Sequence, residues 1–261
     1  MARPHMDFIE TEEVAEEYLE EGPWFGAIRR LLSVDDQTGA STAVLDCHPL
    51  WGADLSVEAG LLEVYVVEGD LVANGERLGR GGYVRAEEAS HVTELRAISG
   101  ARLLVMHDPS YEAPGGPQTV LVLDTELLPW EHPGLGGPAG ITVKMLQADL
   151  TRGPLCLLAA NVARYGSGPE FHSCPEELYV LGGDVTGRHG TMTTGSYFWR
   201  PEFVNHGPYW SETGLLVLLR GHGDLYAYWH DDADATPEQN RVTLPRFQAE
   251  RAAKAAAAAR S

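Results

Sequence analysis

The sequence predicts an all-β protein made of two similar antiparallel barrels of the jelly-roll type. The first observation is an internal repeat, in which residues such as Glu63 and Glu177 recur 114 positions apart. The second is a series of short β-rich segments separated by Gly and Asp turns, a pattern typical of antiparallel barrels. The third is length, because 261 residues suffice for two domains that each bury their own core.

The repeat extends through most of each half without a gap. The pairs that keep the spacing of 114 positions are Tyr65/Tyr179, Val66/Val180, Gly69/Gly183, Asp70/Asp184, Gly81/Gly195, Tyr83/Tyr197, Gly100/Gly214, Asp35/Asp149 and Gly39/Gly153. A period of this length indicates two copies of one domain. We therefore expect an N-terminal domain over residues 1–117 and a C-terminal domain over residues 118–261.

Short elements are expected throughout the first copy. Residues 10–21 are acidic with high helix propensity and end at Gly22-Pro23, which predicts a short surface helix. Strand candidates follow at residues 43–46, 63–67, 71–73, 82–85 and 101–106. The Pro- and Gly-rich residues 109–117 predict the end of this domain.

The second copy is expected to begin after residues 130–140 and to end near Trp229. Residues 119–123 form a further strand candidate before it. An acidic loop is expected over residues 230–237. The Ala-rich basic stretch 246–260 predicts a C-terminal helix, either docked or frayed.

Four residues of the second copy have the chemistry of metal ligands. Glu170 and His172 are two positions apart, so on a strand they share one face and can both enter a barrel lumen. Glu176 follows at the turn into a strand at 178–181, and His206 follows on a later strand. Two neutral imidazoles and one carboxylate that leave open positions form the set typical of non-haem Fe(II) oxygenases, although Mn, Ni or Zn also fits.

These segments resemble the two metal-site motifs of cupins, G-x5-H-x-H-x3,4-E-x6-G and G-x5-P-x-G-x2-H-x3-N. Glu170, His172 and Glu176 occupy the places of the first His, the second His and the Glu, with Gly183 at the closing Gly. Gly195, Pro201 and His206 match the second motif, whereas Phe203 and Trp210 replace its Gly and Asn. The resemblance implies a bicupin, two jelly-roll barrels in one chain with short terminal helices.

The first copy lacks these ligands. Its equivalents are Ser56 for Glu170, Glu58 for His172, Leu62 for Glu176 and Val92 for His206. His91 is one place out of register and would point to the other face. We expect one divalent metal per chain, Fe(II) favoured, held in the C-terminal domain by His172, Glu176 and His206 with Glu170 as fourth ligand. Glu177 is expected to be structural, because its equivalent Glu63 persists in the copy without the site.

Aromatic and Arg residues near the motifs predict a pocket for a small organic molecule. Arg200 could bind a carboxylate or enolate oxygen through paired hydrogen bonds. Glu170, Arg200 and Tyr179 are the predicted catalytic residues, with Glu170 as a proton carrier if it is not a ligand. Cys174 is an alternative ligand or a redox-sensitive thiol.

Three functional classes follow from this site. The first is a metal-dependent dioxygenase that cleaves a small ketone, diketone or hydroxyaromatic compound with O2. The pattern H-x3-E-E-L-Y-V-L-x-G resembles the cupin branch of acetylacetone- and dihydroxyacetophenone-cleaving dioxygenases and anti-sigma-factor domains. The second class is a redox-neutral isomerase, lyase or polyketide cyclase, and the third is a non-catalytic ligand-binding cupin.

The composition limits which partners and which cellular compartment we expect. The net charge of −19 would repel nucleic-acid phosphates and anionic lipids, so neither is expected as a partner. Three cysteines, Cys47, Cys156 and Cys174, are too few for a disulfide framework and fit a reducing cytoplasm. No apolar run reaches the roughly 18 residues of a membrane span. The sequence leaves a homodimer open.

Overall fold

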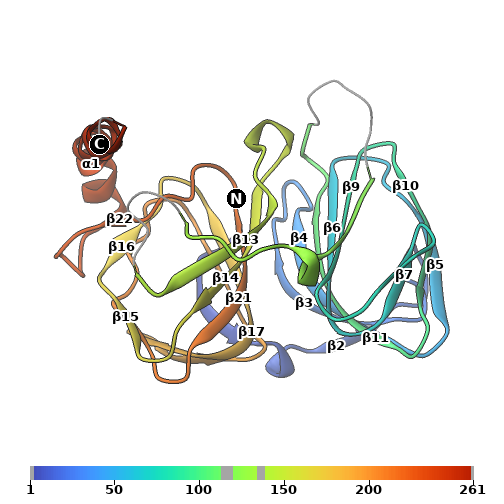
Figure 1. Cartoon of the computed structure of the whole chain (residues 1–261). Helices are drawn as coiled ribbons and strands as arrows, with labels where there is room; N and C mark the ends of the chain where they lie inside the picture. The colour runs from blue at the N-terminus through green and yellow to red at the C-terminus, as the bar shows by residue number, and fades with distance from the viewer. Residues whose placement is uncertain (1–2, 113–119, 134–138, 260–261) are drawn as a thin grey trace. The chain divides into compact units, whose positions relative to one another are not determined.

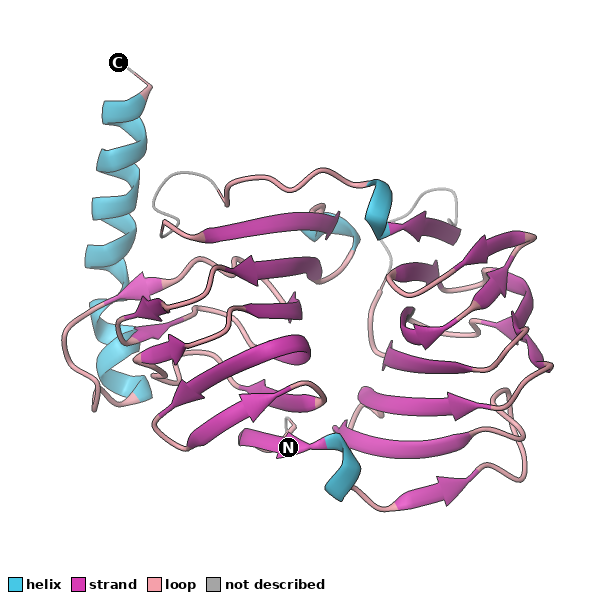
Figure 2. Ribbon diagram, turned by 60° about the horizontal axis from the view of Figure 1, so that its bottom comes forward, coloured by secondary structure: helices cyan, strands magenta, loops and turns pink. Residues whose placement is uncertain are grey.

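The computed structural model describes residues 3–112, 120–133 and 139–259. Most of its regular structure is β-strand, and a long helix lies at the C-terminal end (Figures 1 and 2). No described helix combines the length and the apolar composition needed to span a membrane. Contacts divide the chain into two compact units: unit 1 consists chiefly of residues 9–129, and unit 2 of residues 5–8, 130–150 and 154–261.

Unit 1 contains two antiparallel sheets. The larger has the order β12-β9-β6-β11-β4-β3-β2 and the smaller the order β5-β10-β7-β8. Their bounds are β2 Glu16–Tyr18, β3 Ile28–Val34, β4 Ser41–Cys47, β5 Trp51–Ser56, β6 Leu61–Gly69, β7 Leu71–Ala73, β8 Glu76–Leu78, β9 Gly82–Glu87, β10 His91–Ala97, β11 Ala101–Asp108 and β12 Val120–Asp124, with 3-10 turns η1 Thr11–Glu13 and η2 Thr125–Leu127. The strands predicted in this half are confirmed, apart from Thr119, which lies outside the described residues.

Both sheets of unit 1 contribute to one continuous core. Leu45, Val64 and Leu103 come from the larger sheet, Leu55 and Leu95 from the smaller, and all are at most 4% exposed. Along each strand the side chains alternate between two faces, and these residues lie on the inner one. The interior of unit 1 is therefore packed with apolar side chains.

Unit 2 has the same plan. Its main sheet follows the order β1-β19-β17-β21-β14-β13, with β15, β18 and β20 paired off this path, and β16 pairs with β22. The bounds are β1 Met6–Glu10, β13 Ile141–Gln147, β14 Leu155–Asn161, β15 Tyr165–Ser167, β16 Glu170–Phe171, β17 Glu176–Gly187, β18 Gly190–Thr193, β19 Ser196–Arg200, β20 Tyr209–Ser211, β21 Leu215–Gly221 and β22 Tyr228–Trp229, with η3 Leu150–Arg152 and helix α1 Pro237–Ala258. Strand β14 has the bounds of β4 shifted by 114 positions, so the repeat in the sequence is a repeat in the fold.

The predicted N-terminal helix at residues 10–21 is wrong. This stretch continues from β1 through η1 into β2, which pairs with β3. The guanidinium group of Arg29 donates hydrogen bonds to Glu17, and that of Arg30 donates one to Glu16, on the neighbouring strand. These cross-strand charge pairs favour an extended acidic segment over the helix that its propensity suggests.

The C-terminal helix is confirmed but begins earlier than expected. Helix α1 starts at Pro237 instead of residue 246. Thr236 caps it, because its hydroxyl accepts a hydrogen bond from the Gln239 N–H while the Gln239 side chain accepts one from the Thr236 N–H. Pro at the first helical position completes this start signal.

The strands that precede each repeat join the other repeat's sheet. Strand β12 precedes the second repeat yet pairs with β9 of unit 1, whereas β1 precedes the first repeat and pairs with β19. By contacts, unit 1 runs on to Pro129 and unit 2 includes residues 5–8. The predicted boundary between residues 117 and 118 lies outside the described residues.

Candidate metal centre

Three segments bring the predicted ligands together. Glu170 begins β16, His172 lies two residues further along the same extended stretch, and Glu176 is the first residue of β17. His206 comes from the segment before β20, where a backbone bridge joins it to Glu170. Each of these two N–H groups donates to the other residue's carbonyl, with N···O distances of 2.9 Å.

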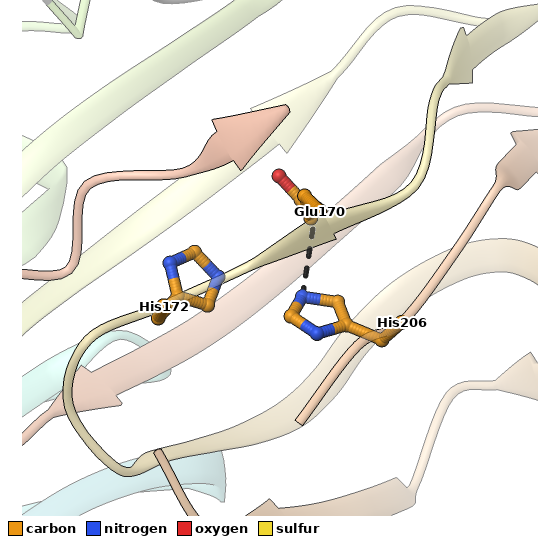
Figure 3. A group of neighbouring side chains, drawn as sticks. All are labelled: Glu170, His172 and His206. Atoms are coloured by element: carbon orange, nitrogen blue, oxygen red, sulfur yellow. Dashed lines mark ion pairs between the residues drawn. The ribbon is translucent and has the colours of Figure 1, made fainter. Parts of the chain in front are cut away.

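Both imidazoles contact the carboxylate of Glu176, and that of His206 also contacts Glu170. The Nε2 atoms of His172 and His206 lie 3.5 and 3.4 Å from the two carboxylate oxygens of Glu176. His206 Nε2 is also 3.7 Å from Glu170 Oε1, the ion pair dashed in Figure 3. Donor atoms of Glu170, His172 and His206 all lie within 4.8 Å of one another.

These separations fit the ligands of a single ion. Nitrogen and oxygen ligands about 2.1 Å from a metal are about 3.4 Å apart in a tetrahedral arrangement. The distances from Glu176 to the two imidazoles match this value. The side chains are also withdrawn from solvent, with exposed fractions of 9% for His172, 5% for Glu176 and 7% for His206.

Backbone carbonyls fix the orientation of both imidazole rings. His172 Nδ1 lies 3.1 Å from the Tyr226 carbonyl oxygen, and His206 Nδ1 lies 3.0 Å from that of Val204. A carbonyl only accepts hydrogen bonds, so in a neutral ring Nδ1 carries the hydrogen and Nε2 presents its lone pair. Hydrogen bonds of this kind from the second nitrogen are usual for metal-bound histidines.

The electrostatics of the cluster also favour a cation. Burial lowers the pKa of His206 to about 3, so its ring is neutral at physiological pH. Burial, together with the neighbouring Glu176, raises the pKa of Glu170 to about 8. Burial would also raise the pKa of Glu176, but the surrounding groups, the charged Arg200 among them, leave it lowered. A neutral imidazole lone pair facing carboxylate oxygens is unfavourable unless a cation lies between them, and a divalent metal supplies it.

The predicted catalytic residues have different surroundings. Arg200 Nη1 is 3.4 Å from Glu176 Oε1, and its guanidinium lies 3.5 Å from the centre of the Phe198 ring. Tyr179 is buried, but strand alternation places it on the opposite face of β17 from Glu176 and Leu178. It does not line the cavity described below, so a direct catalytic role for Tyr179 is not supported.

Glu177 lies beside the site without joining it. Its carboxylate accepts hydrogen bonds from the Tyr197 hydroxyl at 2.8 Å and from Arg220 Nη1 at 2.9 Å. In unit 1 the Tyr83 hydroxyl donates in the same way to Glu63. The equivalent arrangement in a unit without the ligands agrees with a structural role for Glu177.

Unit 1 has buried apolar side chains at two of the four ligand positions and the exposed Ser56 and Glu58 at the other two. Leu62, the equivalent of Glu176, is 7% exposed, and Val92, the equivalent of His206, is 1% exposed; both belong to the core of unit 1. Within the described part of the chain, Glu170, His172 and His206 form the one group of three His, Cys, Asp or Glu donor atoms that all lie within 4.8 Å of one another, and Glu176 contacts both of its imidazoles. Cys174 is buried nearby but is not a member of that group.

A cavity of about 390 Å³ opens beside the ligands within unit 2. Glu170, His172, Glu176, Arg200 and His206 all contribute to its wall. Most of the remaining wall is apolar and comes from alternate residues of β13, β14 and β21. The cluster can therefore act on an organic molecule held in this space.

Two contributors to the site were not anticipated from the sequence. Arg251 of helix α1 lines the cavity, where it pairs with Asp224 and lies over the Tyr226 ring at 4.0 Å. The Tyr226 carbonyl orients His172. An Ala-rich helix and a backbone oxygen carry no recognisable motif, so no local signal identified them.

Comparison with known proteins places the chain among domains of this fold. A family model described as "Domain of unknown function (DUF4437)" matches residues 19–228. No curated protein matches the chain.

Several solved structures are similar over most of their length. One, described as a "putative dioxygenase" from Nostoc punctiforme, has 19% identity and a TM-score of 0.73 and covers 88% of this chain and 87% of its own. The Ylba protein of E. coli has 12% identity and a TM-score of 0.63, with coverage of 84% and 92%. Oxalate decarboxylase of Lactobacillus farciminis, solved with formate, has 10% identity and a TM-score of 0.59, with coverage of 90% and 95%. At these identities the likeness establishes the fold, and it confirms the predicted all-β cupin architecture.

Proposed function

The chain belongs to the DUF4437 family, and we propose that its unit 2 is a metal-dependent enzyme. The proposed activity is that of an Fe(II)-dependent dioxygenase cleaving a small ketone, diketone or hydroxyaromatic compound. The observation that carries it is the convergence of His172, His206 and Glu176 on one point in the wall of a cavity. Two imidazoles and a carboxylate that leave positions open are typical of non-haem iron oxygenases.

His172, Glu176 and His206 would hold the metal, and Glu170 would be the fourth ligand. An Fe(II) ion bound there would supply open positions for substrate oxygens and the redox chemistry that O2 requires. The protein's own part is to orient these side chains and to keep bulk water away. The carbonyls of Tyr226 and Val204 fix the imidazoles, and Arg200 holds Glu176.

Arg200 is also placed to bind the substrate. Its guanidinium lines the cavity and contacts Glu176 through one of its nitrogens, Nη1. Further N–H groups of the same side chain can donate to a carboxylate or enolate oxygen. A substrate held in this way would present its oxygens to the metal side of the cavity.

A second candidate is redox-neutral chemistry by an isomerase, lyase or cyclase. The favouring observation is Glu170, whose pKa is raised to about 8 by burial and by Glu176. A carboxyl group that titrates near neutral pH and faces a cavity can give or take a proton. Oxalate decarboxylases are among the proteins of similar fold.

The deciding experiment is anaerobic purification followed by separate reconstitution with Fe(II), Zn(II), Mn(II) and Ni(II). Ketones, diketones and hydroxyaromatics are then screened while oxygen uptake and products are recorded. We expect oxygen uptake with Fe(II) alone, lost in His206→Ala and kept in His189→Ala, whose side chain is 56% exposed. Turnover with Zn(II) and no oxygen uptake would favour the redox-neutral class. Ligand binding without turnover under any metal would favour a non-catalytic protein.

A further inference from the structure

The cavity of unit 2 separates into a polar part and an apolar part. Glu170, His172, Glu176, Arg200 and His206 form the polar part and contact one another. The rest of the wall is mostly apolar and includes Val143, Ala159, Leu178, Phe198 and Val217, with Asn161 and Ser167 as polar exceptions. Asp224 and Arg251, with side chains 52% and 41% exposed, mark where the cavity meets solvent.

Unit 1 fills the equivalent positions with buried side chains. The partly buried residues that pack against the core of unit 2 include Ala159, Leu178, Tyr209 and Leu219. Their equivalents 114 positions earlier are Leu45, Val64, Leu95 and Val105, which are 2%, 1%, 0% and 6% exposed. The partial exposure in unit 2 is therefore a property of its interior and not of the fold.

Ala159 is the one of these four residues with a smaller side chain than its equivalent in unit 1. It lies on β14, opposite Val143 on one neighbouring strand and Val217 on the other. All three residues line the cavity. A leucine at this position, as Leu45 is in unit 1, would project its branched end into that space.

The volume sets the size of molecule that fits. The cavity volume of about 390 Å³ is many times the roughly 10–15 Å³ that a single water molecule needs. A small dianion bound between the metal ligands and Arg200 would leave most of this apolar space unfilled.

We infer that the ligand of this site has one oxygen-rich head at the metal ligands and an apolar body in the lumen, and that Ala159 determines specificity by leaving room for that body. This inference deepens the proposed function and rests on it for the role of the head. For the apolar body, the inference rests on the apolar side chains of the cavity wall.

The test compares two diketones that share a head and differ in the body, acetylacetone with a methyl group and benzoylacetone with a phenyl group. Dissociation constants are measured by calorimetry on Zn(II)-loaded protein for the wild type, Ala159→Leu and Ala163→Leu. Ala163 is exposed, which makes it the matched control. We expect benzoylacetone to bind at least about tenfold more tightly than acetylacetone in the wild type and in Ala163→Leu. In Ala159→Leu the two should bind about equally, with zinc content and acetylacetone affinity unchanged.

Equal affinity in the wild type, or the same preference in Ala159→Leu, would overturn the inference. If Ala159→Leu fails to fold, Ala159→Val provides a smaller filling of the same space. A metal-free arm uses propylbenzene, which has a body and no head: it should raise the melting temperature of the wild type and not that of Ala159→Leu. If propylbenzene stabilises the wild type but the protein binds no metal, the inference about the lumen is supported and the proposed function is contradicted. Oxygen uptake with acetylacetone, together with equal affinities for the two diketones, would support the proposed function and overturn the inference about the lumen.

Discussion

Asp70 and Asp184, 114 positions apart, make the same pair of contacts in the two units. The Asp70 carboxylate accepts hydrogen bonds from the backbone N–H groups of Ile98 and Ser99, each at 3.0 Å. Asp184 accepts from Glu212 at 3.2 Å and Thr213 at 3.0 Å. Each aspartate thus stabilises the turn that leads into a central strand, β11 in unit 1 or β21 in unit 2.

This relationship predicts an acid-sensitive contribution to stability. The hydrogen bond from the Ser99 N–H, aided by Arg77, lowers the pKa of Asp70 in the folded protein. A lowered carboxyl pKa stabilises the fold above the unfolded value of about 3.9, and the stabilisation is lost as pH falls through the folded value. Asp70→Asn should therefore unfold at lower denaturant concentration at pH 7, and its difference from the wild type should shrink below about pH 3.9. Asp36→Asn, an exposed site in the same unit, serves as the control; a difference independent of pH would contradict the assignment.

Metal binding should stabilise unit 2 through its ligands. At a free Zn(II) concentration about 100 times the dissociation constant, the free energy of unfolding should rise by about 2.7 kcal/mol. His206→Ala should abolish this gain and reduce the metal content from one ion per chain, while its circular dichroism spectrum stays that of a β protein. His189→Ala should behave like the wild type. Elemental analysis that finds two ions per chain, or full retention by His206→Ala, would rule out the ligand set.

The buried Tyr–Glu pairs should contribute to the free energy of unfolding and not to metal binding. Glu63 and Glu177 are 0% and 2% exposed, and each accepts a hydrogen bond from a buried tyrosine hydroxyl. Tyr83→Phe and Tyr197→Phe each remove one donor to a buried carboxylate, which should cost about 1–3 kcal/mol of unfolding free energy. Chemical denaturation measures the loss, and metal analysis should find unchanged content in both variants. A loss of metal in Tyr197→Phe alone would point to a role for Glu177 in the centre.

Two glycines with positive φ should respond differently to a methyl group. Gly183 has φ of +82°, and a Cβ there would lie 1.9 Å from the Gly214 carbonyl oxygen. Gly195 has φ of +94°, but a Cβ would meet nothing within 4 Å. Gly195→Ala should cost about 1–2 kcal/mol from backbone strain alone. Gly183→Ala must also displace backbone and should cost more than about 4 kcal/mol. Similar melting temperatures for the two variants would contradict this account.

The sequence predicted the repeat and the ligand cluster because both depend on regular spacing. Glu170 and His172 face one lumen since side chains alternate along an extended chain, and the comparison with Leu62 and Val92 located the unit without ligands. The same alternation argues against Tyr179, which is an odd number of positions from Glu176 and so faces the other way.

Other features depend on partners far away in the sequence. The acidic residues before Gly22 look helical alone, and only pairing with Arg29 and Arg30 makes them extended. Arg251 enters the cavity wall because α1 packs Phe247 against Phe171, a contact between segments that no local pattern connects. Tertiary contacts of this kind override local propensity.

The exchange of β1 and β12 between the repeats has a consequence for how this protein can be divided. A single repeat cut from the chain keeps its own leading strand, which belongs in the other sheet, and lacks the strand that covers β9 or β19. Such a fragment would expose an unpaired sheet edge. It could pair that edge only by exchanging leading strands with a second fragment, as in a domain-swapped dimer. Because the two repeats are joined in one chain, the exchange of β1 and β12 is intramolecular and does not depend on protein concentration.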